Sequence, residues 1–380
     1  MSKNALILSG GGARAAYQVG VLQALTELLP KTEETPFPII CGTSAGAINA
    51  LSLAGHSGCF SDAAKDLMSI WQSLTMDRVF HTGWKDLAKG VARFGFSLFN
   101  EGVGRNGSIS LLDNAPLREF LNEVISFDTL NQSIADGTLE AVCVTAMGYT
   151  SGESVSFFQG HQDLKEWRRF RRTGVKAQLT VDHLMASAAI PTVFPTVRID
   201  DEFYGDGAVR QTAPISPALH LGADRVFVIG VSSNRNPEVW TKRRMPAKRS
   251  PSMAHIVGHM LNSVFIDSLE GDIEHLERVN KLLSLIPQSV LQEMNSPLRP
   301  VETMVISPSR PLDKMAGRNV RYLPAAMKFF LSATGGTARG GGSAATSYLL
   351  FERAFTDELI ELGYKDAMWE KNKIEEFFGC

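Results

Sequence analysis

The stretch PIICGTSAGAINALSLAG, residues 38–55, limits most strongly what this chain can fold into. A short apolar run leads into Gly-Thr-Ser-Ala-Gly and a helical pattern follows, which is the strand, sharp turn and helix of a serine-hydrolase nucleophile elbow. Ser44 is then the candidate nucleophile, with Gly42 and Gly46 as supporting residues of the turn. A turn of this kind predicts a sheet strand whose end carries a reactive serine.

The rest of the chain repeats the alternation of short apolar runs and helical patterns that is typical of α/β proteins. Strands are predicted at residues 5–8, 38–41, 139–147, 154–158, 225–231 and 303–307, and helices at 16–29, 61–75 and 110–126. The segment 89–108, rich in Gly and Phe, is predicted to be a mobile loop or lid. We therefore expect an α/β fold with a central, mostly parallel sheet between helices.

With 380 residues the chain exceeds the usual domain size of about 100–200 residues. Its character changes after residue 235, where a polar, basic segment with three prolines (234–252) reads as a connector. A long amphipathic helix is predicted at 253–286, and two further helices after the glycine-rich segment 334–343. We expect a catalytic core at 1–235 and a mainly helical extension at 236–380 packed on it, with its late strand returning to the main sheet.

The composition is that of a globular protein, with 44% hydrophobic and 21% charged residues. A net charge of -2 gives no general attraction to nucleic acid. The start of the chain lacks the apolar region of a signal peptide, and no window approaches 18 apolar residues. Cys41, Cys59, Cys143 and Cys380 have no CxxC spacing, and the first and third lie in strand-like runs, which predicts buried free thiols and a cytoplasmic protein.

Three glycines stand between the first strand and its helix, in SGGGAR. Gly10, Gly11 and Gly12 can turn their N–H groups toward an anion, and the helix start adds partial positive charge. One candidate anion is a pyrophosphate, because Gly10-x-Gly12-x-x-Ala15 fits the relaxed dinucleotide pattern. That reading needs an acid at the end of the second strand, whereas the acids at 33–34 precede it. The other candidate is the tetrahedral oxyanion formed when the serine attacks an acyl group.

Two charged residues, Arg14 and Asp206, are expected to lie close to other polar or charged groups. Arg14 lies in the first turn of a helix, where a cation costs about 0.3–1 kcal/mol, so we expect a nearby carboxylate or a ligand phosphate. Asp206 follows a strand-like run and is flanked by Gly205 and Gly207. Its carboxylate can therefore approach other groups closely, although Asp-Gly alone is a common hairpin turn.

The ordered set SGGGAR, GTSAG and DGA, with ASAAIPTVFPTVRI at 186–199, resembles the patatin-like phospholipase family, including its bacterial members, over about residues 5–230. The resemblance implies a Ser-Asp dyad without histidine that acts on acyl esters of lipids and needs no cofactor or metal. By position, Ser44 is the nucleophile, Asp206 the base, and the three loop glycines supply the oxyanion donors. The sequence departs from the family at Ala15, where Gly is common, so we expect the helix to start slightly earlier.

Histidines were considered independently of this resemblance. A triad in the order Ser, acid, His requires a histidine after the acid, which leaves His220, His255, His259 and His275. Capping or packing roles are expected for His56, His183 and His220. A metal at His255 and His259 is not expected, because no Glu completes an H-E-x-x-H pattern. We hypothesise that no histidine serves the nucleophile and that Asp206, with an ordinary pKa near 3.9, takes the proton during attack.

Two basic runs, at 165–176 and 242–249, are either solvated surface or contacts with an anionic membrane. Each Lys or Arg near such a bilayer contributes about 1 kcal/mol, and Trp167 and Phe170 could enter its interface.

The functional prediction is hydrolysis of carboxylic esters in phospholipids or lysophospholipids through an acyl-enzyme on Ser44. The substrate partner is thus an ester lipid, with possible peripheral contact at the inner face of the membrane and no nucleic acid. Two alternatives stay open: an acyltransferase that uses the same acyl-enzyme, and a catalytically silent regulator that binds a lipid or nucleotide.

Overall fold

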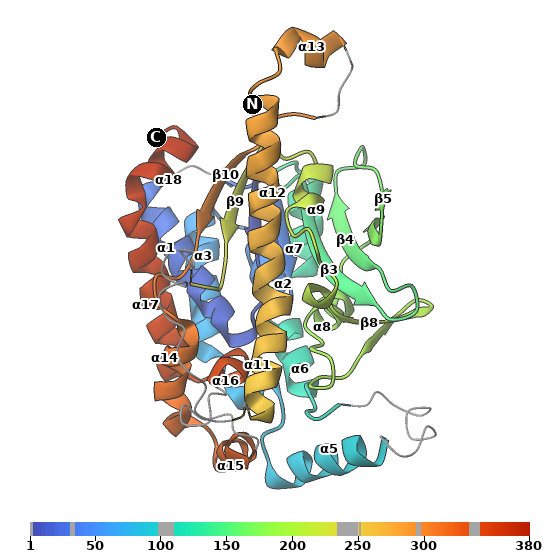
Figure 1. Ribbon diagram of the computed structural model, residues 1–380, viewed down its shortest axis with the longest axis vertical. Helices are drawn as coiled ribbons and strands as arrows, with labels where there is room; N and C mark the ends of the chain where they lie inside the picture. Colours follow the sequence, from blue (N-terminus) through green and yellow to red (C-terminus); the bar gives the residue numbers. More distant parts are fainter. Residues whose placement is uncertain are drawn as a thin grey trace.

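The computed structural model describes residues 3–30, 35–97, 110–233, 250, 252–293, 298–333 and 343–380 (Figure 1). Its strands form one ten-stranded sheet in the order β10-β9-β1-β2-β3-β4-β6-β5, with β8 paired to β3 and β7 to β8. The strands are β1 (Asn4–Leu8), β2 (Ile39–Thr43), β3 (Ala141–Gly148), β4 (Ser154–Gly160), β5 (Trp167–Arg169), β6 (Arg172–Lys176), β7 (Val197–Ile199), β8 (Glu202–Asp206), β9 (Arg225–Ile229) and β10 (Glu302–Ile306).

The centre of the sheet is parallel, from β10 through β9, β1 and β2 to β3. Leu8 at the end of β1 pairs with Gly42 of β2 and with Ile229 of β9. Because the carboxyl ends of parallel strands meet at one edge, the loops after β1 and β2 emerge side by side. Strands β4 and β8 both run antiparallel to β3. The mostly parallel sheet expected from the sequence is confirmed.

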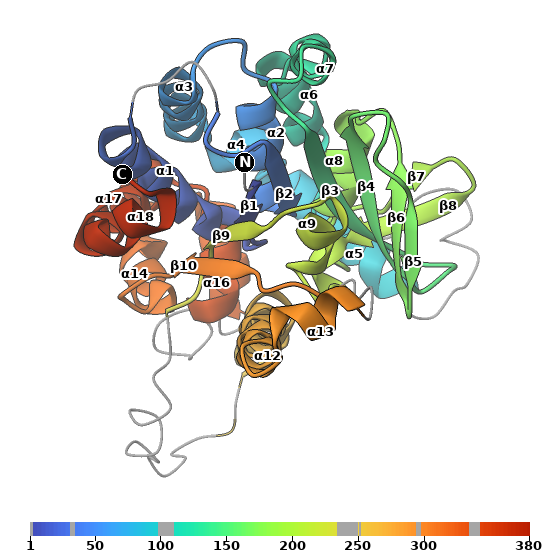
Figure 2. The same cartoon turned by 90° about the horizontal axis from the view of Figure 1, so that it is seen from above.

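Helices cover both faces of the sheet. They are α1 (Ala16–Leu28), α2 (Ala45–Ala54), α3 (Phe60–Ser73), α4 (Met76–Val79), α5 (Trp84–Ser97), α6 (Ala115–Val124), α7 (Phe127–Ala135), α8 (Val181–Ser187), α9 (Ser216–His220), α11 (Met253–Asn262), α12 (Ser268–Leu283), α13 (Gln288–Glu293), α14 (Leu312–Asn319), α15 (Ala325–Ala333), α16 (Ser343–Leu349), α17 (Arg353–Trp369) and α18 (Lys371–Phe378). Figure 2 shows α12 on one side of the sheet and α2 and α3 on the other.

The side chains of β1 alternate between two hydrophobic clusters. Leu6 and Leu8 face the cluster that contains α1, α2 and α17, whereas Ala5 and Ile7 face the one that contains α9 and α12. The alternation follows from the two-residue period of a strand, and burial on both faces explains why the run is apolar throughout.

Residues beyond 235 share this sheet and core. Strand β10 pairs in parallel with β9, so the late strand returns to the main sheet as predicted. Helix α17 lies along α1, and a Cβ on Gly20 would stand 1.9 Å from the carbonyl oxygen of Ile360. The two helices therefore approach each other at a distance that only glycine allows.

The predicted helix at 253–286 is present as α11 and α12, joined by a π-helical turn at Ser263–Asp267. Three helices rather than two follow the glycine-rich segment, because α16 precedes α17 and α18. Helices α14 and α15 were not predicted. Nearly all of the predicted connector at 234–252 lies outside the described residues.

The prediction of a mobile loop or lid at 89–108 is wrong for residues 89–97, the part that the structure describes. Residues 84–97 form α5, because Leu87, Gly90 and Phe94 are spaced for one helical face and Gly90 packs against the carbonyl oxygen of Leu111. Residues 98–108 of that segment lie outside the described residues. No helix in the described part of the chain has the length and apolar character needed to cross a bilayer.

The cysteines are free, and Cys41 and Cys143 are buried as predicted. Cys59 is half-buried and Cys380 is exposed, so burial does not extend to all four.

Candidate active site

Ser44 occupies the turn between β2 and α2 with a backbone that non-glycine residues rarely adopt. Its φ is 54° and its ψ is -129°. A Cβ on Gly46 would lie 2.2 Å from the carbonyl oxygen of Leu8, and one on Gly42 would lie 2.5 Å from that of Gly46. Gly46 therefore lets the turn pack against the end of β1, and Gly42 lets the end of β2 approach the first turn of α2. This is the strained elbow that the sequence predicts, with Ser44 at its apex.

Asp206 ends β8 directly opposite this turn. The Oγ of Ser44 donates a hydrogen bond of 2.7 Å to Oδ2 of Asp206, and the N–H of Ala208 donates to Oδ1 at 3.0 Å. A Cβ on Gly207 would stand 2.1 Å from the carbonyl oxygen of Thr145, so glycine lets the chain turn closely beneath β3. Asp206 is fully buried.

Burial raises the pKa of Asp206 to about 7, although the hydrogen bonds from Ser44 and Ala208 act in the opposite direction. The ordinary value near 3.9 expected from the sequence is therefore wrong, because desolvation of the carboxylate outweighs its two donors. A carboxyl group that titrates near neutrality is well suited to accept a proton from a hydroxyl and return it later.

The glycine loop after β1 lies against the nucleophile. A Cβ on Gly10 would stand 3.1 Å from Cβ of Ser44 and 3.0 Å from the ring of Phe265. Gly10, Gly11 and Gly12 are buried, yet none of their N–H groups donates to a protein acceptor within the described ranges of the chain. Unpaired buried donors beside a serine form an arrangement that can receive a developing oxyanion.

Gly12 has a φ of 54° and begins a 3-10 turn that ends at Ala15 and continues into α1. A Cβ on Gly12 would stand 2.1 Å from the carbonyl oxygen of Tyr348. The helical turn thus starts ahead of Ala15, which agrees with the early start expected for that residue.

Arg14 does not pair with a carboxylate of the described residues, which was one of the two expected anions. The side chain is buried; its Nε donates to Oγ of Ser347 at 2.7 Å, and its guanidinium lies 4.1 Å from the ring centroid of Tyr348. No carboxylate lies within ion-pair distance of it in the part of the chain that the structure describes. A hydroxyl, a backbone carbonyl of Ala344 and an aromatic face replace it, so Arg14 fastens the loop to α16.

Ser187 was not recognised from the sequence. Its Oγ accepts the N–H of Ser44 at 2.8 Å and donates to the carbonyl oxygen of Thr145 at 2.6 Å. The residue is fully buried at the end of α8, where it links the elbow to β3. A serine between alanines in an otherwise apolar segment was the available signal.

An apolar cavity opens at Ser44 on the α2 face of the sheet. Its remaining lining residues are Gly12, Ala45, Ile48, Ile70, Trp71, Leu74, Val79, Leu117, Phe120, Leu121, Ala188, Ile190, Phe194, Tyr348 and Phe351. The free space amounts to about 30 Å³, roughly the share of one water molecule. The cavity therefore offers hydrocarbon contact next to the nucleophile but is nearly closed in this structure.

The model of the family described as Patatin-like phospholipase matches residues 6–219, which include Ser44, Asp206 and the glycine loop. The chain belongs to the patatin-like phospholipase family. It is 29% identical over 216 residues to a cGAMP-activated phospholipase of Pseudomonas aeruginosa, and 24% identical over 233 residues to one of Escherichia coli. These matches cover 57% and 58% of the chain, and the chain spans about half the length of the curated relatives, 55% of each.

Solved structures resemble this patatin-like chain more distantly. Human GIVD cytosolic phospholipase A2 superposes with a TM-score of 0.45 at 11% identity, covering 100% of this chain and 60% of that one. VipD from Legionella pneumophila gives a TM-score of 0.34 at 12% identity, covering 98% and 67%.

Histidines stand apart from the Ser44 and Asp206 pair of this family member. No histidine is hydrogen-bonded to either residue in the described part of the chain. His183 accepts the N–H of Thr180 at 3.1 Å and so caps α8, as predicted. His255 and His259 face each other, with their Nε2 atoms 3.1 Å apart. The described residues contain no group of three or more His, Cys, Asp or Glu side chains arranged to hold a metal.

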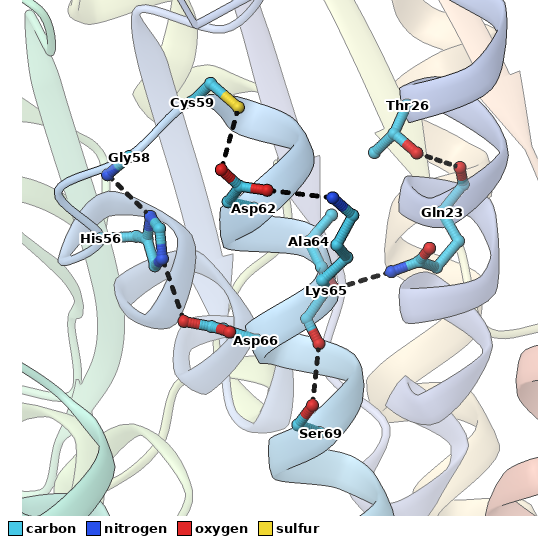
Figure 3. A network of polar contacts seen from close by, with 10 residues as sticks. All are labelled: Gln23, Thr26, His56, Gly58, Cys59, Asp62, Ala64, Lys65, Asp66 and Ser69. Atoms are coloured by element: carbon cyan, nitrogen blue, oxygen red, sulfur yellow. Dashed lines mark hydrogen bonds and ion pairs between the residues drawn. The ribbon is translucent and has the colours of Figure 1, made fainter.

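His56 belongs to a surface network at the start of α3 (Figure 3). Its Nδ1 accepts the N–H of Gly58 and its Nε2 pairs with Asp66, while Asp62 bonds both Cys59 and Lys65. The network joins the end of α2 to α3, which gives His56 a local structural role.

The first basic run forms the hairpin β5–β6. Trp167 stacks on Phe158 at 5.1 Å and is only partly exposed, so it is held by the sheet and does not project outward as expected. Phe170 at the tip is 85% exposed. The second basic run, at 242–249, lies outside the described residues.

Proposed function

We propose that this chain hydrolyses carboxylic esters of phospholipids or lysophospholipids through an acyl-enzyme on Ser44. The observation that carries the proposal is the 2.7 Å hydrogen bond from the Ser44 hydroxyl to a buried Asp206 whose pKa is raised to about 7. The pair joins a nucleophile to a base that is matched to neutral pH.

In the first half of the proposed reaction, Oγ of Ser44 attacks the ester carbonyl as its proton moves to Oδ2 of Asp206. The carbonyl oxygen becomes an oxyanion, which the N–H groups of Gly10, Gly11 and Gly12 are suited to stabilise. Collapse of the tetrahedral species breaks the bond to the alcohol, which leaves with the proton of Asp206. In the second half, water gives a proton to Asp206 as its oxygen attacks the carbonyl carbon of the acyl-serine. Collapse of this second tetrahedral species breaks the bond to Oγ of Ser44, which regains the proton from Asp206, and the fatty acid leaves.

The apolar cavity supports an acyl chain as the group transferred. Its walls are hydrocarbon, and Ser44 is part of the lining, so a chain in the cavity would bring its carbonyl to the nucleophile. Because only about 30 Å³ is free, side chains such as Trp71 and Phe120 must move when an acyl chain binds.

Both curated relatives bear the name cGAMP-activated phospholipase, which supports phospholipid as the substrate class. The same name supports a second proposal: cGAMP increases the hydrolysis rate of this chain. Assays with and without cGAMP, at equal lipid concentration, test it; equal rates would reject it.

The central experiment measures fatty acid release from phosphatidylglycerol and lysophosphatidylglycerol vesicles by the whole chain and by Ser44→Ala. A fluorophosphonate probe is expected to label Ser44, with the adduct located by mass spectrometry. Label on another residue, or release undiminished in Ser44→Ala, would reject the proposal. Product that forms only when an alcohol or thiol acceptor is added would instead identify an acyltransferase.

A further inference from the structure

A second cavity lies on the α9 and α12 face of the sheet, opposite the face that holds the Ser44 cavity. It has a volume of about 570 Å³, is open to solvent on one side, and is bordered by the hairpin β5–β6, α9, α12 and residues 298–301 before β10. Sites for small organic ligands occupy about 300–1,000 Å³, so this cavity has a suitable size.

Two like charges stand directly opposite each other on its wall. Arg169 and Arg172 are cross-strand partners in the hairpin, and both line the cavity. Within the described ranges Arg172 has no side-chain hydrogen bond or ion pair, and Arg169 bonds only the carbonyl oxygen of Arg168. Like charges at directly opposed positions destabilise a strand pair. An anion between them would remove that repulsion.

His220 adds an unsatisfied polar atom beside this pair. Its Nε2 is buried and has no hydrogen-bond partner among the described residues, and its ring packs against Trp167 at 4.9 Å. The pKa of His220 is lowered to about 4, mainly by burial and in smaller part by the charges of Arg169 and Arg172. Arg169 and Arg172 thus place positive charge beside the imidazole at this wall.

The acidic groups nearby offset that positive charge only in part. Asp272 is the one carboxylate among the described residues that line the cavity, and its Oδ2 already accepts the N–H of Ile215 at 2.8 Å. A third arginine, Arg299, is paired with Asp224 at 3.1 Å. Burial raises the pKa of Asp272 while the attraction to the charge of Arg172 acts in the opposite direction, but within the described ranges no carboxylate lies at ion-pair distance from Arg169 or Arg172.

We propose that this cavity binds a phosphate-bearing organic ligand, with Arg169 and Arg172 as the phosphate contacts. The planar guanidinium fork matches phosphate oxygens in two parallel hydrogen bonds. Leu219, Leu276 and Val279 give the cavity an apolar side, which suits a base or a glyceryl group next to the phosphate. A metal cation is excluded as the occupant by the sign of the charge.

The cavity also touches the helix that reaches the active site. Asp272 and His275 lie on α12, and the π turn that precedes α12 places Phe265 against Gly10. A ligand in this cavity would contact α12. The glycine loop of the active site contacts the π turn that continues into α12, so both would touch one continuous helical segment.

The test is calorimetric titration of the full chain with three probes: cGAMP, glycerol 3-phosphate and inorganic pyrophosphate. Binding of at least one is expected, and the tightest probe tells whether the site prefers a nucleotide, a lipid headgroup or bare phosphate. The double variant Arg169→Gln/Arg172→Gln is expected to weaken binding at least tenfold. The matched control is Arg168→Gln/Arg171→Gln, because Arg168 points to the other face of the hairpin and pairs with Glu153.

A second readout uses the unmodified protein. Bound phosphate is expected to raise the pKa of the His220 ring, measured by NMR titration, because an anion favours the imidazolium. Failure of all three probes to bind at 10 mM, on the order of ten thousand times a micromolar dissociation constant, would overturn the proposal. Equal weakening by the control pair would overturn it as well. Since binding is measured directly, the result does not depend on whether the chain hydrolyses lipids.

Discussion

The hydroxyl of Ser44 is hydrogen-bonded to the carboxyl group of Asp206 across 162 positions of sequence. The sheet register creates this contact: Thr43 at the end of β2 pairs with Thr145 of β3, and the neighbouring Ala146 pairs with Asp206 of β8. Strands β2 and β8 pair with successive residues along the edge of β3 opposite β4, and so deliver the two side chains to one point. The relationship depends on the fold of the whole sheet, and we expect the pair to behave as one unit.

The first prediction concerns this unit. Asp206→Asn keeps the shape of the side chain but cannot accept the proton of Ser44, so kcat/KM should fall by at least about 10³-fold, nearly as far as in Ser44→Ala. The double variant should lose little more, because each partner is ineffective without the other. Hydrolysis of a soluble short-chain ester measures this, with circular dichroism to verify folding.

Single histidine variants are the control for the prediction on Ser44 and Asp206. Single changes to Ala at His183, His220, His255, His259 and His275 should each keep turnover within about tenfold of the unmodified chain, below about 1.4 kcal/mol in the barrier. A folded histidine variant as inactive as Ser44→Ala would replace the dyad with a triad.

The second prediction is a pH profile. Asp206 must be ionised to accept a proton, and burial raises its pKa to about 7, so kcat/KM should rise with pH up to about 7 and level off above it. An ordinary aspartate would give a flat profile from pH 5 upward. Initial rates on the soluble ester between pH 5 and 9 distinguish the two, provided stability is verified at each pH.

The same carboxyl group should make stability depend on pH. In the unfolded chain it titrates near pH 3.9, whereas in the folded protein it titrates at about 7. Between these values the folded protein holds a proton that the unfolded chain has released, so its free energy of unfolding falls as pH rises, by on the order of a few kcal/mol. Above about pH 7 this loss is complete.

Urea unfolding at pH 5 and pH 8 measures that fall, and Asp206→Asn is the comparison. The variant has no group to ionise at this position, so its stability should decline less between the two pH values. All other titrating groups are shared and cancel in the difference. An identical decline in both proteins would mean that Asp206 is ionised throughout this range.

Much of this site could be predicted because its determinants are local in sequence. A glycine-rich turn, an elbow and an Asp-Gly pair each constrain their own backbone. Ser44 followed from the elbow, whereas the role of Asp206 followed from the resemblance to a family in which these three blocks occur in this order. The pKa of Asp206 could not be predicted, because desolvation depends on strands β3 and β8 closing over it. The partners of Arg14 lie more than 300 positions away, at Ser347 and Ala344, and no local pattern links them to the loop.

Strands and helices could be predicted where a single pattern of apolar residues dominated the segment. The apolar run of β9 and the long helical pattern of α12 gave correct assignments. Helix α5 was missed because most of its residues are exposed and its glycines suggested a loop, although three residues share a helical face. The basic residues of the hairpin β5–β6 predicted an exposed segment, whereas Trp167 of β5 packs inward on Phe158.

A further prediction concerns Ser187. Ser187→Ala leaves the N–H of Ser44 and the carbonyl oxygen of Thr145 without their partner, so the free energy of unfolding should fall by about 1–3 kcal/mol. Ser52 offers a matched control in α2, because its Oγ is buried without a partner among the described residues. Ser52→Ala should be neutral or slightly stabilising. Equal losses in both variants would deny Ser187 a specific role in holding the elbow.

The last prediction concerns attachment to a bilayer, which we propose occurs at the tip of the hairpin β5–β6. Phe170 is 85% exposed there beside Arg168 and Arg171, so an aromatic ring and two cations can meet an anionic surface together. Phe170→Ala should weaken sedimentation with phosphatidylglycerol vesicles at least about tenfold, since full burial of a Phe side chain contributes about 1.5–3 kcal/mol. Trp369→Ala is the control, because Trp369 is 88% exposed on α17, across the molecule from β5 (Figure 1). Binding of the unmodified chain should also decline with salt, and hydrolysis of a soluble ester should stay unchanged in both variants. If Trp369→Ala lowered sedimentation as much as Phe170→Ala, attachment would not be specific to the hairpin.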